Sequence, residues 1–118
     1  NVYNSKYSDY RFQSNGNIIV KRIIDIYAIE VKNKKMYVYL GDKIYEEDVR
    51  SSLKEKEDKF ITHHFVKCHK SYMVNMWKIS EIKKDDIILK NGYSIPLSRN
   101  FRNFVLEKFN VFISRQKI

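Results

Sequence analysis

The sequence predicts a mainly β fold with two short helices, built as one domain. At 118 residues, of which 43% are hydrophobic, the chain has enough apolar side chains for a single core. Dipeptides that favour tight turns lie between runs in which apolar and polar residues alternate, the pattern of β-hairpins. These dipeptides are Asn15-Gly16, Gly41-Asp42 and Asn91-Gly92.

A two-residue turn places the residues at equal distances on either side of it opposite each other. The cross-strand pairs predicted in this way are Phe12 with Ile19, Tyr39 with Ile44, and Ile88 with Ile95. Pro96 has no N–H to donate, so we expect its strand to lie at a sheet edge or to end there.

The remaining strands are predicted from runs rich in β-branched and aromatic residues. The run IIDIYAIEV, residues 23–31, indicates one strand, and ISEIKKDDIIL, residues 79–89, indicates two strands around Asp85-Asp86. The cationic segment 32–35, Lys-Asn-Lys-Lys, lies between strand-like runs. We expect it to form an exposed hairpin tip.

Two segments carry helix signals. Ser52 and Glu55 have capping-box spacing and predict a short helix to about Asp58. A second helix is predicted after Ser98, a favourable N-cap residue. Its apolar residues recur at helical spacing and are expected to pack on the core; they are Phe101, Phe104, Val105, Phe109 and Phe112.

The net charge of +9 is unevenly distributed. Residues 1–58 carry 11 Lys/Arg against 10 Asp/Glu, whereas residues 59–118 carry 12 against 4, a net +8. A one-sided excess favours a polyanionic partner, which is nucleic acid or an anionic membrane surface. No apolar run approaches the roughly 20 residues that span a bilayer. The single cysteine excludes an internal disulfide and fits a reducing, cytoplasmic location.

The segment FVKCHKSYMVN, residues 65–75, concentrates reactive residue types. Structural zinc sites usually combine separated ligand pairs, but every candidate here falls between His63 and His69. Neighbours such as Cys68 and His69 point to opposite faces of a strand and cannot form a nucleophilic pair. The sequence also has no P-loop and no GxGxxG motif. We therefore predict no metal, no cofactor and no enzymatic activity.

The same segment suits an anion. Lysine and serine side chains donate to phosphate oxygens, and a helix N-terminus attracts anions through free N–H groups and the helix dipole. Arginine can bond guanine in a bidentate manner, which makes Arg99 the best candidate for reading a base. The candidate anion-binding residues are Lys34, Lys35, Lys67, Lys70, Ser71, Ser98 and Arg99.

These motifs resemble the LytTR family, the C-terminal DNA-binding domains of many bacterial response regulators. FVKCHKSYMVN is similar to the family hallmark F-x-R-x-H-R-S-Y-L-V-N, with lysines at 67 and 70 in place of the usual arginines. The resemblance continues through ISEIK (79–83) and IILKNGYSIPLSR (87–99), and VRSSLKE (49–55) is similar to R-x-S-L-K-E. The cysteine before the histidine resembles the branch of accessory-gene and virulence regulators of low-GC Gram-positive bacteria.

The resemblance covers about residues 9–110. It implies an elongated stack of mostly antiparallel sheets, not a helix-turn-helix. Loops would enter successive major grooves, with contacts at Lys34, Lys35, Lys67, Lys70, Ser71, Ser98 and Arg99. His69 would be a buried structural residue, and Cys68 a partly buried small side chain.

The resemblance also implies a longer protein. The chain does not begin with Met, and we expect a linker remnant at 1–8, the DNA-binding domain at 9–113 and a tail at 114–118. The expected partners are a receiver domain in the full-length protein, a sensor histidine kinase acting on it, promoter direct repeats in double-stranded DNA, and RNA polymerase. No membrane partner is expected.

Two alternatives stay open at this point. The nine Tyr and seven Phe residues could stack on the bases of single-stranded nucleic acid; stronger binding to a duplex than to its separated strands would exclude this. The domain could instead mediate protein interactions and be basic only for solubility. In that case DNA binding would not respond to alanine at Lys67, Lys70 and Arg99.

Overall fold

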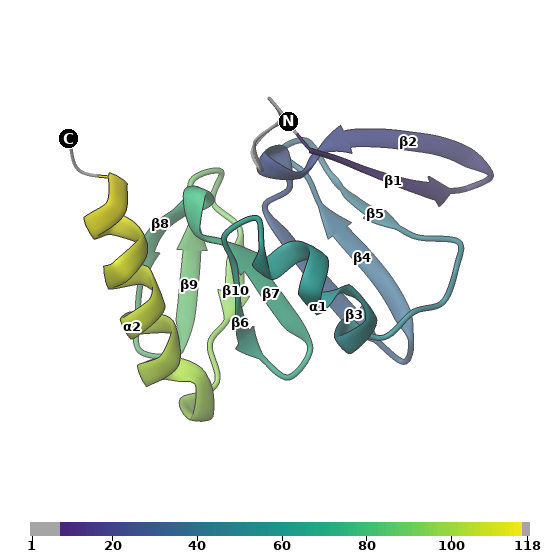
Figure 1. Ribbon diagram of the computed structural model, residues 1–118. Helices are drawn as coiled ribbons and strands as arrows, with labels where there is room; N and C mark the ends of the chain where they lie inside the picture. The colour runs from purple at the N-terminus through teal and green to yellow at the C-terminus, as the bar shows by residue number, and fades with distance from the viewer. Residues whose placement is uncertain (1–7, 117–118) are drawn as a thin grey trace.

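The computed structural model describes residues 8–116 (Figure 1). Most of the predicted 1–8 linker, and the end of the predicted 114–118 tail, lie outside the described residues. The strands are β1 (Asp9–Ser14), β2 (Asn17–Arg22), β3 (Ala28–Lys32), β4 (Lys35–Tyr39), β5 (Ile44–Glu46), β6 (Phe65–His69), β7 (Tyr72–Asn75), β8 (Ile79–Ile82), β9 (Asp86–Leu89) and β10 (Ser94–Pro96). The helices are α1 (Leu53–Ile61) and α2 (Arg99–Gln116), with 3-10 turns η2 (Ile23–Asp25) and η3 (Met76–Lys78).

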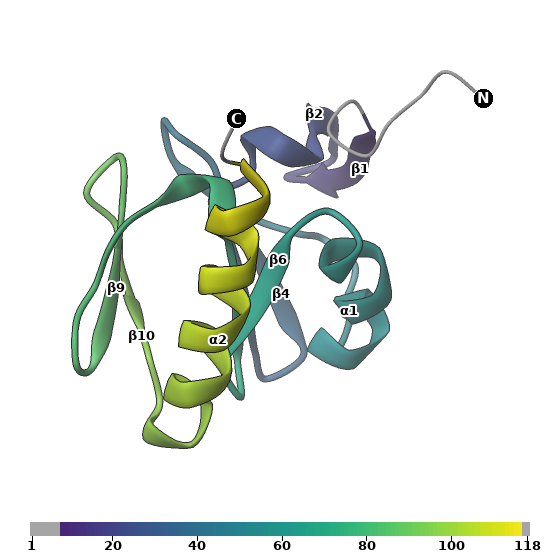
Figure 2. The same cartoon turned by 60° about the vertical axis from the view of Figure 1, so that its left-hand side comes forward.

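The strands form antiparallel sheets of two, five and three strands, in the orders β1-β2, β5-β4-β3-β7-β6 and β10-β9-β8. Both helices pack on β6, one on each side of it (Figure 2). This confirms the predicted mainly β fold with two helices. The extents are 39 × 37 × 25 Å, so the described body is flattened and not elongated as the resemblance implied.

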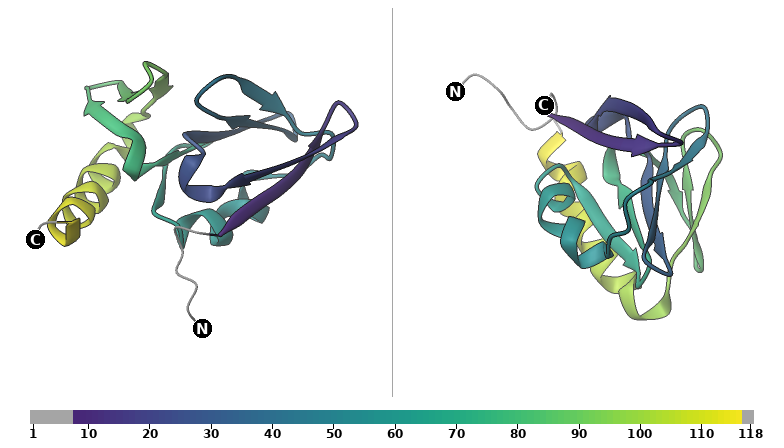
Figure 3. Two further views of the ribbon diagram at one scale, coloured as in Figure 1. Left: turned by 90° about the horizontal axis from the view of Figure 1, so that it is seen from above. Right: turned by 90° about the vertical axis from the view of Figure 1, so that its right-hand side faces the viewer.

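Two apolar clusters stabilise this arrangement. The first joins the β1–β2 hairpin and α1 to the five-stranded sheet, with Phe60, Ile29 and Met36 fully buried. The second joins α2 to the three-stranded sheet and the β6–β7 pair, around Val105 and Ile87. The hairpin and α2 lie at opposite ends of the molecule (Figure 3, left).

The register of the first two hairpins confirms the predictions. Phe12 faces Ile19 across the β1–β2 turn, and Tyr39 faces Ile44 across the β4–β5 turn. β10, which contains Pro96, is an edge strand, as its missing N–H predicted.

The predicted pairing across the third hairpin is wrong. Ile95 faces Ile87, not Ile88. The turn contains three residues, 90–92, of which Gly92 has a φ of +97°, typical of a three-residue hairpin with a residue in the left-handed region. The shift of one residue places both Ile87 and Ile95 in the core, where each is fully buried.

The run 23–31 is only partly a strand. Ile23–Asp25 forms a 3-10 turn, closed by a 3.0 Å hydrogen bond from the Ile26 N–H to the Ile23 carbonyl, and β3 begins at Ala28. The apolar side chains are still buried, since Ile23 and Ile26 have no exposed surface. Their burial produced the strand-like pattern.

Helix α1 begins with the predicted capping box. The Ser52 hydroxyl accepts a hydrogen bond from the Glu55 N–H, and the Glu55 carboxylate accepts one from the Ser52 N–H. The helix continues to Ile61, three residues beyond the predicted end at Asp58.

Helix α2 begins directly after Ser98, as predicted, but its 18 residues make it longer than the expected short helix. It passes the predicted domain end at 113 and reaches Gln116. Val105 and Phe112 are buried. Phe104 is 44% exposed, so the prediction that it packs on the core is wrong. Within the described part of the chain, no helix has the length and apolar character to cross a membrane.

Candidate nucleic-acid interface

Three of the predicted basic segments lie on one edge of the molecule, the lower edge in Figure 1. β3 and β6 both run antiparallel to β7, so they end at the same edge of the five-stranded sheet. The β3–β4 turn, the β6–β7 turn and the start of α2 therefore lie along this edge, which is also the lower end in the right-hand view of Figure 3. We call it the basic edge.

The β3–β4 turn is built from Asn33 and Lys34, which have positive φ values of 54° and 64°. This is the type I′ pattern, in which the second position usually holds glycine. A lysine there carries backbone strain of order 1 kcal/mol, so the turn needs support. The Arg50 guanidinium donates to the Asn33 carbonyl (2.9 Å), and the Ser51 N–H donates to the Lys34 carbonyl (2.9 Å).

The two lysines of this turn differ in their neighbours. The Lys35 ammonium lies 3.1 Å from the Glu46 carboxylate, which partly neutralises it. Lys34 is exposed and forms no ion pair within residues 8–116. Lys34 therefore has the freer cation of the two.

The β6–β7 turn presents Lys70 and Ser71. The Ser71 N–H donates to His69 Nδ1 (3.1 Å), and the Ser71 carbonyl accepts from the Val31 N–H of β3 (2.9 Å). These bonds fix the turn against its own strand and against the neighbouring strand. Lys70 is exposed at its tip.

His69 and Cys68 are buried to different degrees from those expected. A bulge between Lys67 and His69 interrupts the pairing of β6 with β7. Cys68 has no exposed surface and belongs to the core around α2, although a partly buried side chain was predicted. His69, predicted to be buried, is half-buried. It packs edge-on against the Tyr72 ring with centroids 5.3 Å apart.

Cys68 is expected to be chemically inert in the folded protein. Burial raises the pKa of its thiol to about 12, so the nucleophilic thiolate is scarce at neutral pH. We expect iodoacetamide at pH 8 to leave the folded protein unmodified over an hour and to label Cys68 fully in denaturant. Mass spectrometry measures both. Rapid labelling without denaturant would contradict the buried position.

The third basic segment is the start of α2. The Ser98 N–H donates to the Cys68 carbonyl of β6 (3.0 Å), and the Phe101 N–H donates to the Ser98 carbonyl (3.0 Å). Arg99 is the first helical residue, exposed and without an ion pair in the described structure. The helix dipole makes this end attractive to anions.

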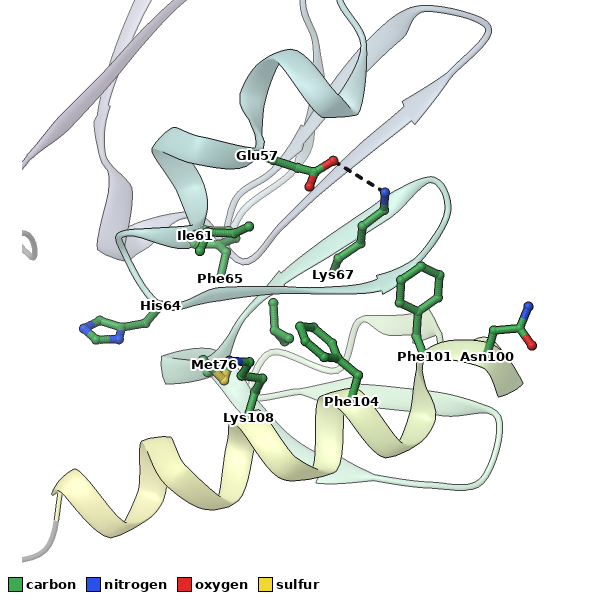
Figure 4. Close-up of a pocket in the computed structure, with 11 residues that line it drawn as sticks. Glu57, Ile61, His64, Phe65, Lys67, Met76, Asn100, Phe101, Phe104 and Lys108 are labelled. Carbon is green, nitrogen blue, oxygen red and sulfur yellow. Dashed lines mark hydrogen bonds and ion pairs between the residues drawn. The ribbon is translucent and has the colours of Figure 1, made fainter.

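Lys67 does not join the other basic side chains. Its ammonium lies 3.5 Å from the Glu57 carboxylate of α1 and 5.8 Å from the centre of the Phe101 ring. Figure 4 shows Lys67 directed toward α1, at the rim of a groove between the two helices. The groove has a volume of about 460 Å³ and is lined in part by Ile61 and Phe104.

Two supporting features were not predicted from the sequence. One is the clamp of Arg50 and Ser51 on the β3–β4 turn, although both residues belong to the VRSSLKE segment. The other is Asn75, the last residue of FVKCHKSYMVN, which is fully buried. Its amide donates to the carbonyls of Ile24 (3.0 Å) and Ile26 (2.8 Å) and accepts from the Trp77 N–H (3.0 Å). In the sequence, the only signal for these supporting roles was that Arg50 and Ser51 lie in VRSSLKE and Asn75 lies in FVKCHKSYMVN.

The antiparallel sheets and the basic edge fit a β-rich DNA-binding domain. The chain belongs to the LytTR family, because the model of the LytTr DNA-binding domain matches residues 16–110. This confirms the resemblance noted in the sequence.

Individual relatives agree with this assignment. The chain is 28% identical over 92 residues to the sensory transduction protein LytT of Enterococcus faecalis, covering 74% of this chain and 37% of that protein. It is 34% identical over 89 residues to the transcriptional regulatory protein YpdB of Escherichia coli K12, covering 70% and 36%. The chain therefore spans just over a third of the length of these curated relatives.

A solved LytTr DNA-binding domain from Bacillus cereus has the same fold. Its TM-score to this chain is 0.75 at 24% identity, over 86% of this chain and 95% of that structure. At this identity the likeness supports the fold alone.

Proposed function

We propose that this chain is the output domain of a two-component transcriptional regulator and binds double-stranded DNA sequence-specifically. The observation that carries the proposal is the basic edge, on which two turns and a helix start lie together with their backbones fixed by hydrogen bonds. Lys34, Lys70 and Arg99 are exposed there and form no ion pair among residues 8–116. Side chains carried on a fixed backbone lose less entropy on binding than side chains on a mobile loop.

The proposed binding mode places these segments in successive major grooves along one face of the duplex. The two largest extents of the protein, 39 and 37 Å, are comparable to one turn of B-DNA, roughly 34–36 Å. Arg99 reads a base, because a guanidinium can bond guanine at two points. Lys34 and Lys70 bind phosphates that border their grooves, and Ser71 and Ser98 donate to further phosphates.

Lys35 and Lys67 take a secondary role in this proposal, since each pairs with a carboxylate. They add positive charge near the phosphates rather than base contacts. His69 and Cys68 act structurally, His69 by holding the β6–β7 turn and Cys68 by filling the core beneath it.

The proposal extends to the whole protein. A receiver domain, phosphorylated through a sensor histidine kinase, would pair two copies so that two such domains occupy tandem promoter sites and help to recruit RNA polymerase. The names of the relatives, a sensory transduction protein and a transcriptional regulatory protein, support this, as does their greater length. We also propose that the DNA-binding domain occupies residues 9–113, with the last turn of α2 extending beyond it to Gln116. The protein is proposed to act in the cytoplasm, with virulence genes as its targets.

A binding selection from a randomised duplex library, at about physiological salt, tests the proposed function. We expect enrichment of a short motif repeated in one orientation, at a spacing of about 10 base pairs or a multiple of it. Retention without a motif would reduce the basic edge to a non-specific surface. Equal retention of separated strands would favour single-stranded nucleic acid instead.

Lys70→Ala is expected to reduce the salt dependence of duplex binding. Each phosphate contact adds about 0.9 to the slope of log K against log salt, so the slope should become shallower by about one. Fluorescence anisotropy at several salt concentrations measures it. The matched control is Lys90→Ala, because Lys90 is exposed in the β9–β10 turn at the opposite edge (Figure 1). Equal slopes for both variants would remove Lys70 from the interface.

A further inference from the structure

A fourth basic connection lies beside the three described above. It is the β8–β9 turn, residues 83–85, with the sequence Lys-Lys-Asp. Figure 2 shows this turn at the lower left, next to the start of α2. The Leu97 N–H donates to the Asp85 carbonyl (2.9 Å). Because Leu97 directly precedes Ser98, this bond holds the β8–β9 turn close to the start of α2.

The turn is fixed and presents two exposed lysines. The Lys83 N–H donates to the Asp86 carbonyl (2.8 Å), which closes it. Lys83 and Lys84 are both exposed. Asp85 and Asp86 follow directly, so residues 83–86 carry no net charge. The two ammonium groups are nevertheless available to phosphates, because neither forms an ion pair with another residue of the described chain.

The position of this turn extends the basic edge at one end. From right to left in Figure 1 the edge carries the β3–β4 turn, the β6–β7 turn, the start of α2 and finally the β8–β9 turn. A duplex that receives Arg99 in one groove therefore continues toward Lys83 and Lys84. There it presents backbone phosphates at close intervals, about one charge per 1.7 Å of helix axis.

We propose that Lys83 and Lys84 form a further phosphate-binding site that contacts the duplex beyond the groove entered by Arg99. This inference rests on the proposed DNA binding and adds a binding element to it. Lysine binds phosphate as a point charge without selecting a base. The site therefore contributes affinity and a longer footprint, and it leaves the selected motif unchanged.

The double variant Lys83→Ala/Lys84→Ala tests the proposal against a matched double variant, Lys43→Ala/Lys90→Ala, on the opposite edge. All four lysines are exposed, so both variants should fold, which circular dichroism checks. We expect the slope of log K against log salt to become shallower by one to two for Lys83→Ala/Lys84→Ala, at about 0.9 per contact. It should not change for Lys43→Ala/Lys90→Ala.

Two further readouts separate the possible results. Hydroxyl-radical footprinting should lose protection at one end of the site only, and the ratio of selected to random duplex affinity should stay within about twofold. If the parent protein binds duplex DNA but Lys83→Ala/Lys84→Ala keeps its slope and footprint, the fourth contact is wrong and the proposed function stands. If the parent protein shows no salt-dependent duplex binding, the proposed function fails and this inference fails with it.

Discussion

Replacing Arg99 by alanine is expected to weaken binding to the selected duplex by about 1–3 kcal/mol, roughly 5- to 150-fold. Binding to random DNA should fall much less, because only the specific complex gains the bidentate contact to a base. A competition assay that compares the selected motif with versions changed at one base pair measures the difference. The loss of preference should concentrate at a single base pair.

The structure gives a reason for the size of this effect. Arg99 begins an 18-residue helix, and the residue before it is bonded through its N–H to the carbonyl of Cys68, which is fully buried. A side chain on so fixed a backbone can hold a defined geometry toward a base. A lysine in a flexible loop would lose more entropy for the same contact.

Two variants make the Arg99 result interpretable. Arg99→Lys keeps the charge but cannot form the bidentate contact, so it should retain affinity for random DNA and still lose the base preference. Arg115→Ala removes the same residue type from the last turn of the same helix, where it is exposed, and should change neither. Equal losses on selected and random DNA would assign Arg99 to a phosphate.

Local signals predicted most of the elements of the fold. The capping box at Ser52 and two of three turn dipeptides gave the correct local structure, because neighbouring residues determine these features. The third turn differed because Gly92 accommodates a three-residue turn as readily as a two-residue one, and burial of Ile87 with Ile95 favours the former. The pairing of Ala28 with Val74 joins distant segments and had no local signal.

The candidate site shows the same limit. Each basic residue of the candidate site was identified from the sequence. Whether its charge is free to bind DNA depends on acidic residues that only the fold brings near. Lys67 meets Glu57 across the α1–β6 contact, and Lys35 meets Glu46 across a strand pair. The different burial of Cys68 and His69 follows from a bulge, which strict alternation of side chains along a strand does not anticipate.

Asn75→Ala is expected to destabilise the fold by about 2–4 kcal/mol. The buried amide of Asn75 is bonded to two carbonyls in the segment from η2 to β3 and to one N–H of η3. Alanine leaves these groups without their side-chain partner, and an unsatisfied buried polar group costs about 1–3 kcal/mol. Thermal or urea unfolding measures the loss. Asn17→Ala, at an exposed position on β2, should leave stability within about 0.5 kcal/mol.

Asn75→Asp tests whether the donated hydrogen bonds are the cause. Aspartate has nearly the same shape and can still accept from the Trp77 N–H, but a carboxylate cannot donate to the carbonyls of Ile24 and Ile26. It would place a negative charge against both, so we expect a loss at least as large as that of alanine. Because Asn75 lies at the end of β7 away from the β6–β7 turn, the folded fraction should bind DNA within about twofold of the parent protein. An Asn75→Asp variant as stable as the parent would show that packing around Asn75, and not its two donated bonds, stabilises the junction between η2 and β7.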